Sequence, residues 1–208
     1  SGAARVGSAA TSGVEKSQRV GDTVWICGPG QRGLASVVAA REAGAGKIIV
    51  TGLAADSNKL QMALALGADH IIDVQNENVV DRVRALTNGK GADVIVEVTS
   101  YATQPVREAL DCVRMGGTVV LAGVKGFKPV SDFVSDLIVM KEITIKGAIG
   151  VTSSGYKKAI EMIERRKYPL ELMHTHNFEL EEAELAIKTL ARQIEGQESV
   201  HSCLIPAT

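Results

Sequence analysis

The residues with the clearest chemical meaning form a glycine-rich segment near the start of the chain. Gly28-Pro29-Gly30-Gln31-Arg32-Gly33 matches the pattern G-x-G-x-x-G, and it follows a predicted strand and opens a predicted helix, which is the context that the pattern requires. Gly28 permits a tight turn, Gly30 lets backbone approach a pyrophosphate, and Gly33 lets the helix pack against the sheet. The N–H groups of that helix favour phosphate. An ordinary glycine-rich turn is the alternative, but the agreement of pattern and context favours a dinucleotide site.

The end of the next predicted strand bears on the identity of this dinucleotide. An acid that binds the plain adenosine ribose is expected about 20 residues after the glycines. Thr51-Gly52 stands there instead, Asp56 follows four residues later, and Lys59 is the nearest base. The missing acid removes repulsion against a 2′-phosphate. NAD and NADP therefore both remain open, and this feature favours NADP.

The histidines and cysteines do not form a recognisable metal-binding pattern. Cys27, Cys112 and Cys203 are widely spaced, which disfavours a zinc-type Cys-x-x-Cys pair and a disulfide framework. Cys27 and Cys112 are expected to be buried, inert thiols. His174 and His176 supply two ligands where a zinc site needs three or more. We therefore expect no metal site, and no catalytic residue, in this chain.

Two further polar groups have structural explanations. Ser153 and Ser154 precede a predicted helix and are expected to cap it rather than to act as nucleophiles, since no His or Asp partner is near in the sequence. Glu97 ends a predicted buried strand. A structural role or a role near the ribose is expected for it.

Short β-branched runs alternate with helical patterns along most of the chain. This alternation predicts βαβ units, and hence an α/β fold with a doubly wound, six-stranded parallel sheet of the Rossmann type whose ligands bind beyond the strand carboxyl ends. The expected strands cover 23–27, 47–51, 69–73, 92–98, 117–122 and 143–147. The expected helices cover 31–43, 56–66, 78–87, 104–114, 154–167 and 181–193, and a short strand is expected near 200–205.

The same patterns divide the chain into three regions. Residues 1–20 are rich in small residues and are expected to form a flexible lead-in. Residues 21–164 are expected to form the dinucleotide-binding domain. Residues 165–208 have an irregular stretch around 173–176 and no obvious βαβ partner, so they are expected to be the C-terminal remnant of a second domain.

Composition excludes several classes of protein. The 208 residues are 45% hydrophobic and 23% charged, with a net charge of −1, which is typical of a globular protein and disfavours disorder and a basic nucleic-acid binder. No apolar run is long enough to span a membrane. A cytoplasmic protein without nucleic-acid or membrane partners is expected.

Six ordered segments resemble the zinc-type medium-chain dehydrogenases, most of all the alcohol and polyol branch with the sorbitol and threonine enzymes. The resemblance covers about residues 14–206. It implies hydride transfer between an alcohol or polyol and a ketone or aldehyde, with NAD or NADP as cofactor. The segments are Gly21-Asp-Thr-Val, Gly28-Pro-Gly, Leu66-Gly-Ala-Asp69, Gly91-Ala-Asp-Val-Ile-Val-Glu97, Gly116-Gly-Thr-Val-Val and Ile143-Thr-Ile-Lys-Gly147.

The resemblance also implies roles for individual residues along the dinucleotide. The glycine-rich segment would bind the pyrophosphate, and Lys59 would lie near the adenosine ribose. Val98 and Thr99 would line the path to the nicotinamide ribose. Two further sets would reach the nicotinamide itself: Ala122, Gly123 and Val124 would face its ring, and Gly147, Ala148 and Ile149 would offer backbone groups to its carboxamide. His201 stands where some relatives have an Arg that contacts the pyrophosphate.

The chain also departs from the family pattern. The Gly-His-Glu motif that accompanies the catalytic zinc is absent, so zinc is expected only in a catalytic domain that this chain lacks, and the chain alone is expected to be inactive. A stand-alone nucleotide-binding module without catalysis is the alternative. Relatives pair their sixth strands across a two-fold axis, so a homodimer or higher homo-oligomer is expected through the edge at 143–149.

Overall fold

The expected six-stranded parallel sheet is confirmed. The computed structural model describes residues 17–150 and 152–206, and its larger sheet has the strand order β3-β2-β1-β4-β5-β6. Chain order reverses between β1 and β4, which lie side by side, and such a reversal opens a crevice beyond the strand carboxyl ends. The strands are β1 (Thr23–Cys27), β2 (Lys47–Gly52), β3 (His70–Asp73), β4 (Ala92–Glu97), β5 (Val113–Leu121) and β6 (Thr144–Gly147).

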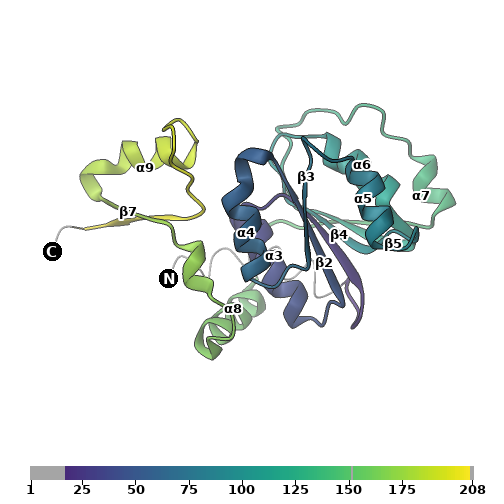
Figure 1. The fold of residues 1–208 in the computed structure, drawn as a ribbon, viewed down its shortest axis with the longest axis horizontal. Coiled ribbons are helices and arrows are strands. Elements are labelled where there is room, and N and C mark those ends of the chain that lie inside the picture. Colours follow the sequence, from purple (N-terminus) through teal and green to yellow (C-terminus); the bar gives the residue numbers. More distant parts are fainter. Residues whose placement is uncertain (1–16, 151, 207–208) are drawn as a thin grey trace.

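Helices cover both faces of this sheet (Figure 1). On one face lie α3 (Gln31–Glu42) and α4 (Ser57–Ala65), the latter preceded by the 3-10 turn η1 (Ala54–Asp56). On the other lie α5 (Val79–Leu86), α6 (Gln104–Cys112) and the short α7 (Asp136–Met140), which the sequence patterns did not predict. The side chains of alternate strand residues point to opposite faces, so the central strands are apolar throughout.

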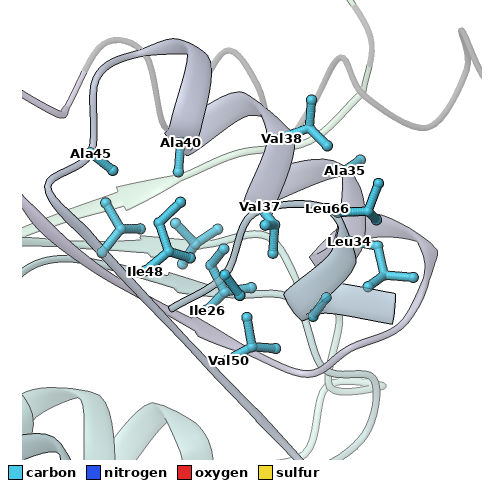
Figure 2. Packing of buried hydrophobic residues seen from close by; sticks show 14 of the residues in the cluster. Ile26, Leu34, Ala35, Val37, Val38, Ala40, Ala45, Ile48, Val50 and Leu66 are labelled. Carbon is cyan, nitrogen blue, oxygen red and sulfur yellow. The ribbon is translucent and has the colours of Figure 1, made fainter. Parts of the chain in front are cut away.

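The packing of α3 on the sheet illustrates this arrangement. Val37 points from the helix toward Ile26 of β1 (Figure 2). Leu34 of the helix and Ile48 and Val50 of β2 belong to the same cluster, and all five side chains are fully buried. Burial of such side chains contributes about 1.5–3 kcal/mol each. The glycine-rich segment thus joins a rigid strand to a rigid helix.

The C-terminal region has more regular structure than expected. After α8 (Ser153–Arg165), the segment around 173–176 is not irregular: it forms the turn η2 (Leu170–Met173) and the strand β7 (His176–Glu179). Then η3 (Leu180–Glu182) and α9 (Ala183–Leu190) lead to β8 (Ser202–Ile205), which pairs with β7 in parallel. The expectation of no βαβ partner is therefore wrong. Four-residue strands with mixed polarity give too weak a signal to be read from sequence.

This region is joined to the first domain by packing. Met173 and Val200 are buried in the same apolar cluster as Leu34 and Val37. Figure 1 shows β7 and α9 beside the α3 and α4 side of the sheet. Whether 165–208 complete a second domain stays a prediction.

Several helices and strands begin or end at other residues than the sequence predicts. The helix at 104–114 ends at Cys112, and β5 begins directly at Val113, four residues before the expected start, with a register shift between Ala92 and Val94. The α8 helix is capped by Thr152, whose hydroxyl accepts a hydrogen bond from the Gly155 amide at 3.1 Å. The capping role expected of Ser153 and Ser154 is thus wrong, since both lie inside the helix.

Two other expectations concern the ends and the environment of the chain. Residues 1–16 of the expected lead-in lie outside the described residues. Within 17–150 and 152–206, none of the helices has the length and apolarity needed to cross a membrane.

Candidate functional site

The glycine-rich segment forms a tight turn between β1 and α3. Gly28 has a φ of +103°, which L side chains rarely adopt, and a Cβ there would lie 2.9 Å from the Thr99 methyl. A Cβ on Gly33 would lie 1.8 Å from the Gly28 carbonyl oxygen, so helix and loop meet only through glycine. Both roles expected from the sequence, a tight turn and close helix packing, are confirmed.

Gly30 differs from these two glycines. Its φ of −67° suits any residue, and a Cβ there would have no described atom within 4 Å. Nothing in the described protein thus requires glycine at this position. Gly30 also precedes the first turn of α3, whose amide groups have no partners within the helix. It therefore leaves open the approach to a row of N–H donors, a standard binding arrangement for phosphate.

A cleft of about 950 Å³ opens beside this turn. Eight of the predicted cofactor residues line it: Gly28, Pro29, Gly30, Gln31, Gly52, Lys59, Val98 and Thr99. The rest of the wall includes Leu53, Asp56, Tyr101 and, from the C-terminal region, Arg192 and Val200. The cleft therefore lies at the carboxyl ends of β1, β2 and β4, beside the reversal of strand order.

One end of the cleft carries two cations and one anion. Asp56 and Lys59 are each only 5% exposed, and the Lys59 ammonium lies 4.0 Å from an Asp56 carboxylate oxygen. The Arg192 guanidinium forms an ion pair with the same oxygen. Burial and the nearby Arg192 lower the pKa of Lys59. Sequence spacing did not reveal Arg192, because it lies 136 residues from Asp56.

The end of β4 is held by a buried ion pair. Glu97 is fully buried, and its Oε1 accepts hydrogen bonds from the Thr99 amide at 2.8 Å and the Lys125 ammonium at 2.8 Å. Lys125 also donates to the Thr99 carbonyl at 2.6 Å. Glu97 Oε2 has no partner among the described residues. Of the two roles expected for Glu97, the structural one is observed, since it fixes the Thr99 segment in the cleft wall.

The remaining predicted residues lie outside the lining of this cleft. Arg32 donates to the Ala122 carbonyl at 3.3 Å, and Gly33 is packed behind the turn. The two sets expected to reach the nicotinamide lie at the ends of β5 and β6, the next strands along the sheet. In these sets Val124 and Ile149 are 57% and 90% exposed. Their contact with a cofactor stays a prediction, for Ala122, Gly123, Val124, Gly147, Ala148 and Ile149.

The structure brings together three metal-ligating side chains that the sequence did not. His174 Nδ1 lies 3.1 Å from His201 Nδ1, which lies 3.9 Å from Cys203 Sγ. His201, which stands where some relatives have an Arg, lies outside the cleft lining and faces His174. Burial and His174 lower the pKa of His201. His176 stacks on Phe178 and takes no part in this group.

The other two cysteines are buried, as expected. Burial is the main cause that raises the pKa of Cys27 well above its ordinary value and that of Cys112 to about 12. Both thiols therefore stay protonated at neutral pH, which makes them unreactive.

Comparison with known proteins places this geometry in context. Residues 33–165 match the family model described as zinc-binding dehydrogenase. A probable alcohol dehydrogenase of Mycobacterium tuberculosis is 38% identical over 190 residues, which are 89% of this chain and 51% of that protein. A sorbitol dehydrogenase of Halalkalibacterium halodurans is 31% identical over 78% of this chain and 46% of its own.

Solved structures of dehydrogenases have the same fold as this chain. The alcohol dehydrogenase TADH from Thermus sp. ATN1 matches with a TM-score of 0.85 and 27% identity, over 96% of this chain and 56% of its own. A chain from Sinorhizobium meliloti 1021, solved bound to NADP, matches with a TM-score of 0.86 and 25% identity, over 98% and 58%. The chain spans about half the length of the curated relatives it matches. By its family match and its fold, the chain belongs to the zinc-binding dehydrogenase family.

Proposed function

We propose that the cleft binds a nicotinamide dinucleotide, and that the chain is the cofactor-binding part of an oxidoreductase that interconverts an alcohol or polyol and a ketone or aldehyde. The observation that carries this proposal is Gly30, which faces open space at the start of α3 while Gly28 and Gly33 are fixed by packing. A pyrophosphate at Gly30 would accept hydrogen bonds from the free amides of the first turn. The alcohol and sorbitol dehydrogenases among its relatives support the reaction class.

The residues of the chain would act by binding and orienting the cofactor. A bound nicotinamide supplies a hydride acceptor or donor, and the protein supplies its position. The Glu97–Lys125 pair would hold the Thr99 segment against the nicotinamide ribose, and the backbone after β5 and β6 would meet the nicotinamide. The Gly-His-Glu motif associated with the catalytic zinc does not occur in this sequence, so the residues of the cleft act on the cofactor alone.

The charges at the adenosine end favour NADP over NAD. The wall there holds the cations Lys59 and Arg192, both paired with Asp56. Glu198, outside the lining, also lies close enough to act on the charge of Lys59. A 2′-phosphate placed there would gain charge-assisted hydrogen bonds, and β2 ends in Thr51-Gly52 rather than in an acid that would repel the phosphate. The NADP-bound Sinorhizobium chain supports this choice.

We also propose a homodimer that pairs β6 edges. The strand β6 lies at the edge of the sheet, and all four of its residues are exposed. Unpaired strand edges tend to find partners. The apolar residues Val139 and Met140 of α7 are also largely exposed nearby in the chain. Light scattering tests this: a dimer mass that Ile145→Lys converts to a monomer mass supports it, whereas a monomer mass for the parent chain rejects it.

The test of cofactor binding uses the single tryptophan. Trp25 is buried on β1, and its indole N–H donates to the Thr51 hydroxyl, a residue of the cleft wall, at 3.2 Å. Energy transfer from Trp25 to a bound reduced nicotinamide would report binding during titration with NADPH or NADH. We expect saturable transfer with both cofactors and tighter binding of NADPH. The proposal is rejected if neither NADPH nor NADH gives energy transfer from Trp25. It is also rejected if the transfer is not reduced when an excess of NADP or NAD is added to compete for the cleft.

A further inference from the structure

We propose that His174, His201 and Cys203 form a binding site for a divalent transition-metal ion of the Zn²⁺ type, separate from the dinucleotide cleft. His174 lies before β7, His201 directly precedes β8 and Cys203 lies in β8, so only the folded C-terminal region brings them together. Their ligand atoms all lie within 4.8 Å of one another.

The spacing of the three ligand atoms matches a tetrahedral metal centre. Zinc bonds of about 2.0–2.1 Å to nitrogen and about 2.3 Å to sulfur put two nitrogen ligands about 3.3 Å apart, and nitrogen and sulfur about 3.6 Å apart. The observed separations are 3.1 Å between the two Nδ1 atoms and 3.9 Å from His201 Nδ1 to Cys203 Sγ. These two separations differ from the tetrahedral values by a few tenths of an ångström, and His174 and Cys203 lie within the 4.8 Å that spans the whole group, so small side-chain movements would close the site around an ion.

A neighbouring amide sets the tautomer that such a site needs. Asn177 Oδ1 lies 2.7 Å from His174 Nε2, and an amide oxygen can only accept, so Nε2 carries the proton. In the neutral ring, Nδ1 of His174 is then an unprotonated ligand directed at His201. Hydrogen bonds of this kind to the second ring nitrogen are typical of metal-bound histidines.

Without a metal, His174 Nδ1 and His201 Nδ1 are joined by a hydrogen bond. With the His174 proton on Nε2, the short contact between the two Nδ1 atoms requires His201 to donate. An ion in that place would bond to His174 Nδ1, to His201 Nδ1 once the ring proton of His201 has moved to Nε2, and to the thiolate of Cys203. One proton, that of the thiol, is released, no electrons are transferred, and a water molecule can take the fourth position.

The donor set and exposure define the class of ion. Imidazole nitrogen and thiolate sulfur suit Zn²⁺, Co²⁺ and related ions, whereas Mg²⁺ and Ca²⁺ prefer oxygen. His174 is exposed and the other two ligands are partly so, which gives an ion a path from solvent. The ion would link the start of β7 to β8 and so stabilise a two-stranded sheet, which is a weak structure by itself.

The test measures metal binding by the metal-free chain. Elemental analysis after equilibration with Zn²⁺ is expected to give one ion per chain, and Co²⁺ is expected to produce a thiolate charge-transfer band. His174→Asn and Cys203→Ser should abolish both signals, and Asn177→Ala should weaken Zn²⁺ binding by about 10- to 100-fold. His70→Asn, which removes a histidine of β3, is the matched control and should bind like the parent chain.

Thiol protection gives a readout on the unaltered chain, in case a variant fails to fold. Cys27 and Cys112 are buried, so Cys203 is the cysteine that reacts with a thiol reagent in the native protein. Zn²⁺ should slow this reaction and Mg²⁺ should not. The site is rejected if Zn²⁺ leaves the reaction rate unchanged, or if folded His174→Asn and Cys203→Ser variants bind one Zn²⁺ as tightly as the parent.

Discussion

Arg192, two residues after α9, forms an ion pair with Asp56, which precedes α4 and lies 136 residues earlier in the chain. This pair joins the C-terminal region to the cleft beside the glycine-rich turn. It also brings a second cation next to Lys59, at the end of the cleft where an adenosine ribose is proposed to bind. The C-terminal region is therefore part of the cleft wall.

The first prediction concerns this cation. Arg192→Gln should weaken NADPH binding about tenfold, or about 1.4 kcal/mol, and should weaken NADH binding much less, because only NADPH carries the 2′-phosphate. Titration of both cofactors, followed through Trp25, measures the two affinities. Arg82→Gln, which removes an exposed arginine of α5, is the control. Equal losses for NADH and NADPH would show that Arg192 does not select the phosphate.

The second prediction separates the glycines of the turn. Gly30→Val should lower the affinity for either dinucleotide at least about tenfold, because its side chain would fill the pyrophosphate approach. The fold should lose less than about 1 kcal/mol, since the position is an unstrained helix N-cap with open space around it. Denaturant unfolding and cofactor titration measure the two effects.

Two further substitutions serve as comparisons for Gly30→Val. Ala85→Val adds the same kind of bulk at an exposed position of α5 and should leave binding unchanged. Gly33→Ala should instead destabilise the fold itself, because its Cβ would overlap the Gly28 carbonyl. Normal cofactor affinity in Gly30→Val would place the pyrophosphate elsewhere.

The third prediction concerns the pair beneath Thr99. Lys125→Met leaves the buried Glu97 carboxylate without its cation and should cost about 3–5 kcal/mol of unfolding free energy. The double variant with Glu97→Gln should recover part of this loss, because no uncompensated charge remains. Chemical denaturation of the two variants tests the coupling. If the double variant is less stable than Lys125→Met, the charge of Glu97 is not the source of the loss.

The fourth prediction concerns pH. Glu42, at the end of α3, accepts hydrogen bonds from Lys167 at 2.6 Å and from the Tyr168 hydroxyl at 2.7 Å, and these lower the pKa of its carboxyl. A lowered folded-state pKa contributes stability above the unfolded pKa that is lost as pH falls through the folded pKa. Glu42→Gln should therefore cost up to about 1 kcal/mol at pH 7.

The contribution of the Glu42 carboxylate to the free energy of unfolding should disappear at acidic pH. The stability difference between the parent and Glu42→Gln should shrink steadily below the ordinary Glu pKa, as followed by urea unfolding at several pH values. Glu161→Gln, which alters an exposed glutamate of α8, serves as control and should show a smaller pH-dependent difference. A difference for Glu42→Gln that stays constant down to pH 2 contradicts this origin.

The sheet and the glycine-rich turn could be predicted from the sequence because their signals are local. Runs such as 47–51 are short and β-branched, and the glycines stand at fixed spacing between a strand and a helix. The doubly wound parallel sheet followed from the alternation of strands and helices. Gly28 and Gly33 confirm the roles that the motif predicts for them.

The rest of the site could not be predicted because it depends on distant contacts. Arg192 reaches Asp56 only after the C-terminal region has packed beside α3 and α4. His174 and His201 lie 27 residues apart and meet only through the parallel pairing of β7 and β8. The four-residue strands of that pair lack the long apolar runs that mark the central strands, so the sequence did not indicate that these side chains would meet.

The central claim is that the turn at Gly30 and the first turn of α3 hold the pyrophosphate of a dinucleotide. Backbone amide NMR spectra of the isotopically labelled chain during titration with NADPH test this most directly. The predicted result is a saturable shift of the amide signals of Gly30, Gln31 and Arg32, with those of β7 unchanged. If NADPH binds and these three signals do not move, or if only signals far from the cleft move, the claim is contradicted.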